Sequence, residues 1–129
     1  MDVLGVIYNE LIADLYIKEK ASGRIKFYDF PETSSVTMAP NIIIDPLDVP
    51  LPKDFADDTW LTYDCLFQIE VWSKNRTNTR ELSEQIGKVM WNFGFHQGTG
   101  PDEWDEETGI YRDARKYRGK LYRDDLDTL

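Results

Sequence analysis

The segment Tyr63–Phe95, YDCLFQIEVWSKNRTNTRELSEQIGKVMWNFGF, contains the clearest structural pattern in the chain. In its first part, apolar residues occupy one set of alternate positions and mainly polar residues occupy the other. The apolar set is Tyr63, Cys65, Phe67, Ile69 and Val71, and the other set is Asp64, Leu66, Gln68, Glu70 and Trp72. A period of two is typical of a half-buried strand, so we predict a strand here.

After the polar turn 73–77 the period becomes helical. One apolar stripe carries Leu82, Ile86, Val89, Met90 and Phe93, and we expect it to lie on the apolar face of the strand. Asn78, with Glu81 three residues later, is a variant of a capping box, and Gly94 is placed to end the helix. The segment therefore predicts a scaffold rather than an active site.

Length and composition suit a single domain spanning residues 1–129. The chain has 129 residues, of which 41% are hydrophobic and 13% aromatic, enough for one core and too few for two ordinary domains. The formal net charge of -9 argues against general affinity for phosphate backbones or anionic membranes. We therefore expect the partners to be proteins.

Cysteine content and hydropathy place the chain in the cytosol where it is made. Cys65 is the single cysteine, which excludes an internal disulfide, and its apolar neighbours favour a core position over a nucleophilic role. No apolar run approaches the ~20 residues that span a bilayer, and the N-terminus does not resemble a signal peptide.

The flanking segments predict further elements. We expect a helix from Asp2 to Lys20, ended by Gly23, with an apolar face of Leu4, Ile7, Tyr8, Leu11 and Leu15. Strands are expected at 24–30, 41–45 and 110–122. Together these elements predict an α+β fold, with a mixed or antiparallel sheet of about four strands packed by two helices.

Two segments are predicted as loops. Residues 46–58 contain three prolines, which disfavour a place inside a sheet, together with four aspartates. Long loops are frequently kept because they contact another molecule, so this one is a candidate partner-contact loop, with Pro46, Asp48, Pro50, Pro52, Phe55 and Trp60 as its candidate residues. The second loop, 97–109, is rich in glycine and acidic residues.

The chain lacks recognisable catalytic motifs. His96 is the only histidine, and no serine stands in a nucleophile elbow. The acidic loop lacks calcium-loop spacing, and Glu70 and Lys74 do not form the acid-x-lysine pair of a metal-dependent nuclease. Gly94, Gly98 and Gly100 make no phosphate-binding pattern. We therefore predict no enzymatic activity, no cofactor and no metal site.

The last predicted strand and the residue directly after it carry six of the 15 basic residues: Arg112, Arg115, Lys116, Arg118, Lys120 and Arg123. One interpretation is a solvent-facing strand balanced by nearby carboxylates. The other is a contact with the acidic loop of a neighbouring copy, head to tail. The candidate subunit interface then comprises Arg112, Arg115, Lys116 and Arg118, facing Asp102, Glu103, Asp105 and Glu106. A basic lining that touches DNA is disfavoured by the net charge.

Three tryptophans, Trp60, Trp72 and Trp104, lie in or beside loops or on the less apolar strand face. Large aromatics at such positions serve either as interface anchors or as ordinary core and rim packing, and both alternatives stay open here. Trp91 lies off the apolar stripe of the predicted helix, where it covers the helix flank or meets another element.

The order of these elements resembles the tail-terminator, or tail-completion, proteins of long-tailed bacteriophages. The most specific part is the run Phe67–Ser73, FQIEVWS, followed by a polar turn and a helix with Glu81, Leu82, Ile86 and Met90. This resemblance implies a non-enzymatic subunit that forms a hexameric ring, ends the tail tube and offers a surface for head–tail joining. The long loops 46–58 and 97–109 depart from short members of that family.

The resemblance also implies partners and a location. The partners are further copies of the chain, the tail tube protein and a head connector protein, with DNA passing through the ring but not bound specifically. The location is the tail or neck of a virion or prophage particle assembled in the bacterial cytoplasm. Three alternatives remain: a head-side neck protein, a small acidic bacterial binding protein, and a metal-dependent enzyme using Asp64, Glu70 or the acidic loop.

Overall fold

The computed structural model describes residues 2–127. The predicted domain spans residues 1–129, so residues 1, 128 and 129 of it lie outside the described range. Within that range the helices are α1 (Val3–Ala13), α2 (Leu15–Ala21), α3 (Arg76–Asn92) and α4 (Arg123–Asp127), with a 3-10 turn η1 (Thr33–Ser35). The strands are β1 (Ile25–Phe27), β2 (Asn41–Pro46), β3 (Leu51–Ala56), β4 (Thr59–Ser73), β5 (Phe95–Gln97), β6 (Asp102–Trp104) and β7 (Tyr111–Tyr122).

The predicted fold class, with about four strands and two helices, is wrong. The part of the chain that the structure describes forms a seven-stranded mixed sheet and four α-helices. Both predicted loops contain strands, because β3 pairs with β4, and β5 and β6 pair with β7. The predicted first helix is divided in two, and residues after the last strand form α4.

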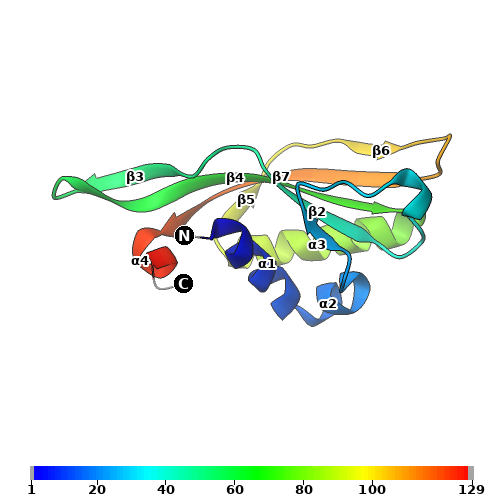
Figure 1. Cartoon of the computed structure of the whole chain (residues 1–129), viewed down its shortest axis with the longest axis horizontal. Coiled ribbons are helices and arrows are strands. Elements are labelled where there is room, and N and C mark those ends of the chain that lie inside the picture. The colour runs from blue at the N-terminus through cyan, green and yellow to red at the C-terminus, as the bar shows by residue number, and fades with distance from the viewer. Residues whose placement is uncertain (1, 128–129) are drawn as a thin grey trace.

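β4 is the central strand (Figure 1). Along one side it pairs antiparallel with β7, from Thr62 opposite Tyr122 to Ser73 opposite Tyr111. Along the other side it pairs first with β3 and then with β2, so two short strands share one long neighbour. β1 extends the sheet parallel to β2. The predicted strands at residues 24–30, 41–45 and 110–122 are thus confirmed, with shifts of a few residues at their ends.

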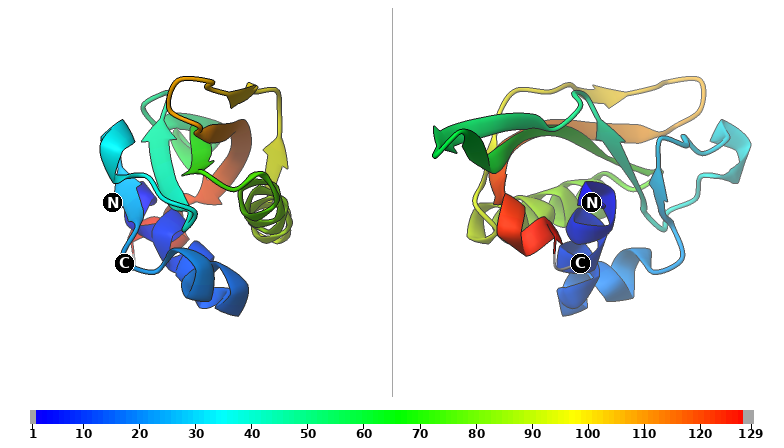
Figure 2. Two further views of the ribbon diagram at one scale, coloured as in Figure 1. Left: turned by 90° about the vertical axis from the view of Figure 1, so that its right-hand side faces the viewer. Right: turned by 60° about the vertical axis from the view of Figure 1, so that its left-hand side comes forward.

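The helices lie on one face of the sheet, where the core forms (Figure 2). Phe67, Ile69 and Val71 of β4 face the α3 stripe, whose buried members include Leu82 and Ile86. All five side chains are no more than 3% exposed. The predicted strand-to-helix unit is therefore confirmed, since the two apolar periodicities meet in one cluster.

The start of α3 differs from the prediction by three residues. Asn75, rather than Asn78, caps the helix: its side chain accepts a hydrogen bond from the backbone N–H of Asn78 at 2.8 Å. The side chain of Asn78 instead donates to the carbonyl of Met38 at 3.2 Å. The predicted end is confirmed, because Gly94 has a φ of 87°, a conformation that costs glycine little.

The predicted helix from Asp2 to Lys20 is interrupted at Asp14. The backbone of Asp14 is extended, and its side chain accepts hydrogen bonds from the N–H of Ile17 at 3.0 Å and from Gln85 at 2.8 Å. Asp14 thus ends α1 and caps α2. The break changes the direction of the second segment, so Ile17 is buried while Leu15, predicted on the apolar face, is 69% exposed.

The segment 46–58, predicted as an extended loop outside the sheet, forms half of a β-hairpin. Residues 51–56 pair antiparallel with residues 59–64, and Asp57 and Asp58 form the turn with φ values of 49° and 61°. Pro52 is tolerated because β3 is an edge strand, which pairs with β4 alone. No helix between residues 2 and 127 is long and apolar enough to cross a membrane.

Candidate assembly surfaces

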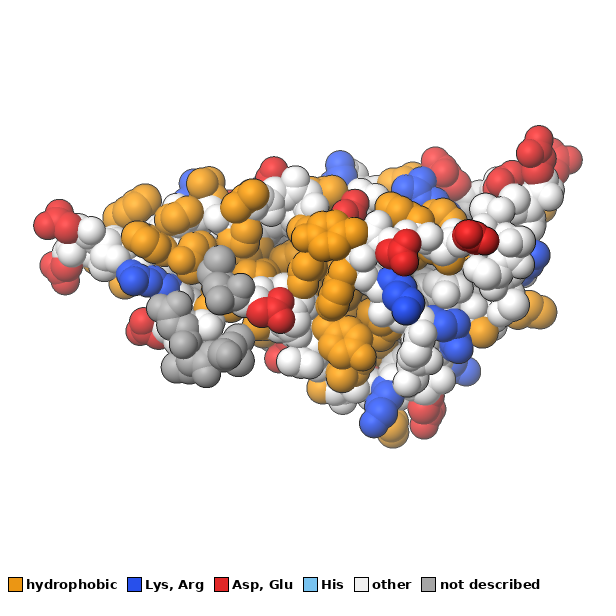
Figure 3. All heavy atoms as spheres, viewed as in Figure 1, with side chains coloured by type: hydrophobic (Ala, Val, Ile, Leu, Met, Phe, Trp, Pro, Cys, Tyr) orange, Lys and Arg blue, Asp and Glu red, His pale blue; other side chains and the backbone are white. Residues whose placement is uncertain are grey.

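The hairpin of residues 51–61, which we call the arm, extends beyond the helical layer at one end of the molecule (Figure 1). It carries Leu51, Phe55 and Leu61, which are 53%, 72% and 49% exposed. Apolar side chains cover much of this end in the space-filling view (Figure 3). Exposed apolar side chains gathered at one end of a molecule are typical of a protein–protein contact surface.

Polar contacts order the arm without hiding its apolar side chains. The carboxylate of Asp54 accepts hydrogen bonds from the hydroxyl of Thr62 at 2.6 Å and the ammonium of Lys120 at 2.9 Å. These two hydrogen bonds lower the pKa of Asp54. Near the turn, the guanidinium of Arg123 lies 4.5 Å from the ring centre of Trp60, a cation–π contact. The arm is therefore ordered before it meets a partner, which reduces the entropy lost on binding.

The segment 46–50 forms a ridge beside the arm, and it contains Pro46, Asp48 and Pro50 of the candidate partner-contact loop. Val49, at its top, is 85% exposed. On one side of the ridge lies a hollow of about 470 Å³, lined mainly by apolar groups including Leu47 and Tyr28. Prolines restrict the backbone of this ridge and hold Val49 in place. The structure therefore brings the predicted loop residues together along one continuous surface, from the ridge to the arm.

Strand alternation divides the predicted basic surface. Arg112, Lys116 and Arg118 lie opposite Trp72, Gln68 and Leu66, on the sheet face away from the helices. Arg115 belongs to the other face, beside α3, where it forms an ion pair with Asp113 at 2.9 Å. The four predicted members therefore do not form one surface.

Three of these basic residues have partners within the chain. Arg112 forms ion pairs with the buried Glu70 and, at 3.2 Å, with Glu103, while Arg118 contacts Asp64 at 2.8 Å. Lys116 is exposed, and in the part of the chain that the structure describes it has no such partner. The interpretation in which nearby carboxylates balance the strand therefore holds for Arg112, Arg115 and Arg118.

Glu70 is 1% exposed and accepts hydrogen bonds from three side chains: Gln68, Trp72 and Arg112. Burial raises the pKa of its carboxyl, but these donors outweigh that effect, so the pKa is lowered overall. Because its acceptor oxygens are engaged by neighbouring side chains, Glu70 supports the fold at the junction of β4 and β7.

The acidic loop is partly used in local structure. Asp102 pairs with Arg80 at 2.7 Å, and Asp105 accepts hydrogen bonds from Glu107 N–H and the hydroxyl of Thr108. Glu106 is exposed and has no such contact among residues 2–127. Across that same range, no group of three or more His, Cys, Asp or Glu side chains is arranged to hold a metal ion.

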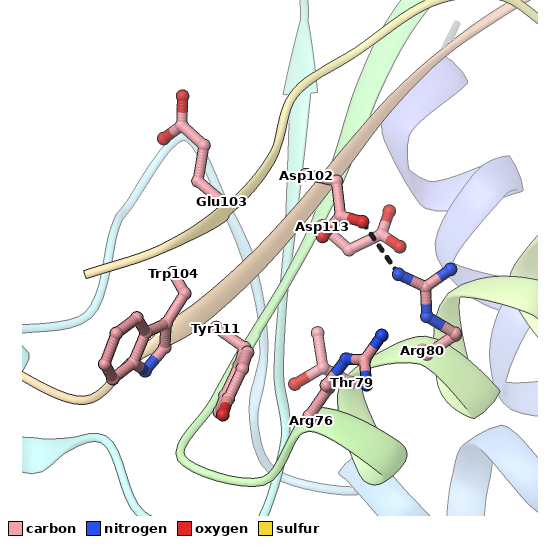
Figure 4. A pocket seen from close by; sticks show the side chains of 8 residues that line it. All are labelled: Arg76, Thr79, Arg80, Asp102, Glu103, Trp104, Tyr111 and Asp113. Atoms are coloured by element: carbon pink, nitrogen blue, oxygen red, sulfur yellow. Dashed lines mark hydrogen bonds and ion pairs between the residues drawn. The ribbon is translucent and has the colours of Figure 1, made fainter. Parts of the chain in front are cut away.

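A small hollow of about 150 Å³ lies between the start of α3 and the β6–β7 hairpin (Figure 4). Arg76, Trp104 and Tyr111 line it beside the Arg80–Asp102 ion pair. Trp104 is 56% exposed, whereas Trp72 packs against Phe30 with ring centres 5.7 Å apart. Of the three tryptophans considered either as interface anchors or as ordinary packing, Trp104 is thus the most exposed, because Trp60 is half-buried beneath Arg123.

The structure adds contact residues that the sequence analysis missed, and it confirms the buried position of Cys65. Leu51 and Leu61 belong to the exposed patch but were not predicted as contact residues. The available signal was weak: aspartate tolerates the positive φ that Asp57 and Asp58 adopt in this two-residue turn. Cys65 is 1% exposed, as predicted, and burial raises the pKa of its thiol to about 11.

Comparisons with known proteins identify the fold. No protein-family model matches the chain, and no curated protein matches it. Among solved structures, a chain from the virion of a native gene transfer agent (GTA) particle has a TM-score of 0.65 and 12% sequence identity. The match covers 90% of this chain and 91% of that chain. The two chains therefore share a fold over nearly their whole lengths.

Proposed function

We propose that this chain is a non-enzymatic structural protein of a phage-like virion, built as one domain over residues 1–129. Its specific role is to terminate the tail tube as a ring, hexameric by its resemblance to tail terminators, and to offer the surface for head–tail joining. It is assembled in the bacterial cytoplasm and resides in the tail or neck. The likeness to a chain of a GTA virion, over 90% of the length, supports the structural role in a virion, and the resemblance of the element order to tail terminators supports the specific role.

The exposed arm is the observation that carries the proposal. A subunit whose task is assembly needs a shaped apolar surface more than reactive groups, and the arm exposes Phe55 at 72% while holding its backbone in a paired hairpin. Together with Val49 on the ridge, it offers an anchor that another protein would bury.

The predicted charge contact between copies belongs to the same proposal. Because Arg112, Arg115 and Arg118 already have partners in their own chain, Lys116 and Glu106 are the members whose charges are available to a neighbouring copy. Exposed pairs contribute only ~0.2–1 kcal/mol each, so this contact would add specificity to an interface that apolar burial stabilises. The tail tube protein and the head connector are the expected partners of the two ring faces.

The first test is the solution mass of the purified chain by light scattering, over a wide concentration range and at two salt concentrations, with negative-stain micrographs of each species. We expect a concentration-dependent closed ring, and we expect that ring to attach to one end of tail tubes from the same particle. A Phe55→Ala variant should form rings at higher concentration only. A chain that stays monomeric and fails to bind tube ends would overturn the proposal and favour a small binding protein.

A further inference from the structure

The hollow beside the ridge, which we call the ridge hollow, lies between residues 46–50 and the start of α1. Its volume is about 470 Å³, and Val3, Leu4 and Leu47 contribute to its mainly apolar lining. Pockets of roughly 300–1,000 Å³ bury most of a small ligand. The ridge hollow therefore has room for one large apolar side chain of another molecule.

The charged groups that line the ridge hollow are both acidic, Asp2 and Asp48. The side chain of Asp2 caps α1, accepting a hydrogen bond from the N–H of Gly5 at 2.9 Å. Asp48 is exposed and has no ion-pair partner in the part of the chain that the structure describes. A side chain that fills this hollow is therefore expected to be apolar, with a positive charge beside it.

Trp91 on α3 has those properties. Its side chain is 64% exposed, and its ring contacts the ring of His96 edge-on, with ring centres 5.1 Å apart. Lys88 precedes Trp91 by three residues, which places the two side chains on one face of the helix. Both residues line one surface hollow. Trp104, which is also exposed, lies instead between the acidic residues Glu103 and Asp105.

The other charged residues near Trp91 are engaged with each other. Glu84 and Arg115 line the same surface hollow, where their opposite charges attract. Arg115 also pairs with Asp113 at 2.9 Å. Lys88, in contrast, is exposed and forms no ion pair among residues 2–127. The charge complementarity with the ridge hollow therefore depends on Lys88.

The ridge hollow and Trp91 lie on opposite flanks of the subunit. In the left panel of Figure 2, the start of α1 lies on one flank and α3, which carries Trp91, lies on the other. One copy therefore cannot bring the two together, whereas neighbouring copies can. A contact between two different surfaces is heterologous, repeats from copy to copy and closes into a ring when the rotation allows.

We propose that the ring of Trp91 from one copy enters the ridge hollow of the next copy. Lys88 then faces Asp48 at the rim, and the same contact covers Val49, which is 85% exposed in the single chain. The aromatic anchor supplies most of the binding energy, and the charge pair favours the correct register. This contact rests on the proposed function, because it names a surface through which the ring subunits meet.

The variant Trp91→Ala tests the anchor. It should raise the concentration needed for assembly at least tenfold, because truncating a buried aromatic anchor removes much of the binding energy. Trp104→Ala is the matched control, since its side chain is 56% exposed on the β6–β7 hairpin, and it should change that concentration by less than about twofold. Thermal unfolding of both variants checks that the fold is kept. Equal effects of the two substitutions on assembly would overturn the contact.

A charge exchange tests the register. Asp48→Lys and Lys88→Glu should each raise the concentration needed for assembly several-fold, because like charges then face each other. The double variant restores an opposite pair and the net charge, so it should assemble within about twofold of the unmodified chain. Asp48→Lys with Lys74→Glu has the same net charge, changes an exposed lysine before α3 and should not be rescued. If this control pair is rescued as well, the effect reflects net charge and the contact is wrong.

Cysteine cross-linking measures the proximity of the two surfaces directly. Asn92 follows Trp91 and lines the same surface hollow. Val49→Cys with Asn92→Cys should give disulfide-linked dimers and larger species on mild oxidation, whereas Val49→Cys with Lys74→Cys should not exceed the background of single-cysteine variants. Native Cys65 is 1% exposed and should not compete.

The outcomes separate this contact from the proposed function. Closed rings that lack the first cross-link and assemble normally after Trp91→Ala would overturn the contact and leave the proposed function standing. The cross-link and the charge rescue in open chains that never close would keep the contact and overturn the ring. Rings that form normally after Trp91→Ala but no longer attach to tail tubes would show that Trp91 binds the tube, and the contact between copies would be wrong.

Discussion

The two halves of β4 lie in different surroundings although they share one continuous backbone. Residues 65–73 lie between β2 and β7 and cover the helices, and their inward side chains Phe67, Ile69 and Val71 are no more than 3% exposed. Residues 59–64 lie beside β3, where Leu61 is 49% exposed. One alternating pattern therefore buries its apolar side chains against the helices in one half of the strand and leaves an apolar side chain exposed in the other.

The largest expected effect on the free energy of unfolding comes from replacing a phenylalanine by alanine in the buried half of β4, and the same replacement in the arm should have little effect. Phe67→Ala should lower the free energy of unfolding by about 3–5 kcal/mol, because it removes a buried ring that lies 6.1 Å from the ring of Phe95 and leaves a cavity. Phe55→Ala, at a ring 72% exposed, should change that free energy by less than about 0.5 kcal/mol. Urea denaturation at neutral pH measures both, and equal losses would show that the arm belongs to the core.

A middle-sized effect is expected at Glu70, where the well-packed half of β4 meets β7. Glu70→Gln should lower the free energy of unfolding by about 1–3 kcal/mol at pH 7, because Arg112 loses a buried charged acceptor. Glu103→Gln is the matched control: its side chain is 61% exposed and contacts the same arginine, so its loss should stay below about 1 kcal/mol.

The pH dependence of that effect follows from the lowered pKa of Glu70. The pKa of the Glu70 carboxyl is about 4.5 in the unfolded chain and lower in the folded chain. The ionised carboxyl therefore stabilises the fold fully when the pH is above the unfolded pKa, and this stabilisation is lost as the pH falls through the folded pKa. The difference in the free energy of unfolding between the unmodified chain and Glu70→Gln should therefore be constant above pH 6 and shrink below pH 4.5. A difference that grows on acidification would contradict this account.

The smallest expected effect lies at the arm turn. Asp57 has a φ of 49° and Asp58 one of 61°. A two-residue turn with positive φ at both positions favours the pair Asp-Gly, with glycine as the second residue. Asp58→Gly should raise the free energy of unfolding by up to about 1 kcal/mol, because glycine adopts a positive φ without steric cost. Asp58→Ala should lower the free energy of unfolding, because alanine is strained at a positive φ and has no polar side chain to form a local hydrogen bond. A shift of the denaturation midpoint in the opposite order would show that the turn is held by something other than its backbone.

The sequence predicted the structure best where a single periodicity dominates. The strand through Ile69 and the helix through Ile86 were placed correctly because each buries one regular apolar face. The sequence does not predict the arm because three prolines disfavour a place inside a sheet, whereas an edge strand needs hydrogen bonds on one side only. Leu15 was misplaced because one aspartate, Asp14, ends a helix that the apolar spacing would continue.

The candidate surfaces were harder to predict because they depend on which carboxylates fold close to which arginines. Alternation alone could have separated Arg115 from Arg112 and Arg118, since adjacent strand positions face opposite ways. That Glu70 would be buried against Arg112 could not be inferred, because the two residues are 42 positions apart and meet only through the pairing of β4 with β7. The contact partners of the arm remain predictions.

The unbroken course of β4 has a mechanical consequence. Its 15 residues, from Thr59 beside the arm turn to Ser73 before α3, contain no glycine or proline and span about 50 Å at the usual rise of a strand. Paired with β7 over most of that length, the strand behaves as a stiff rod without a hinge. In the proposed assembly, a neighbour bound to the arm would therefore also fix the direction of the helical layer, and the twist of this one strand would help to set the curvature of the assembly.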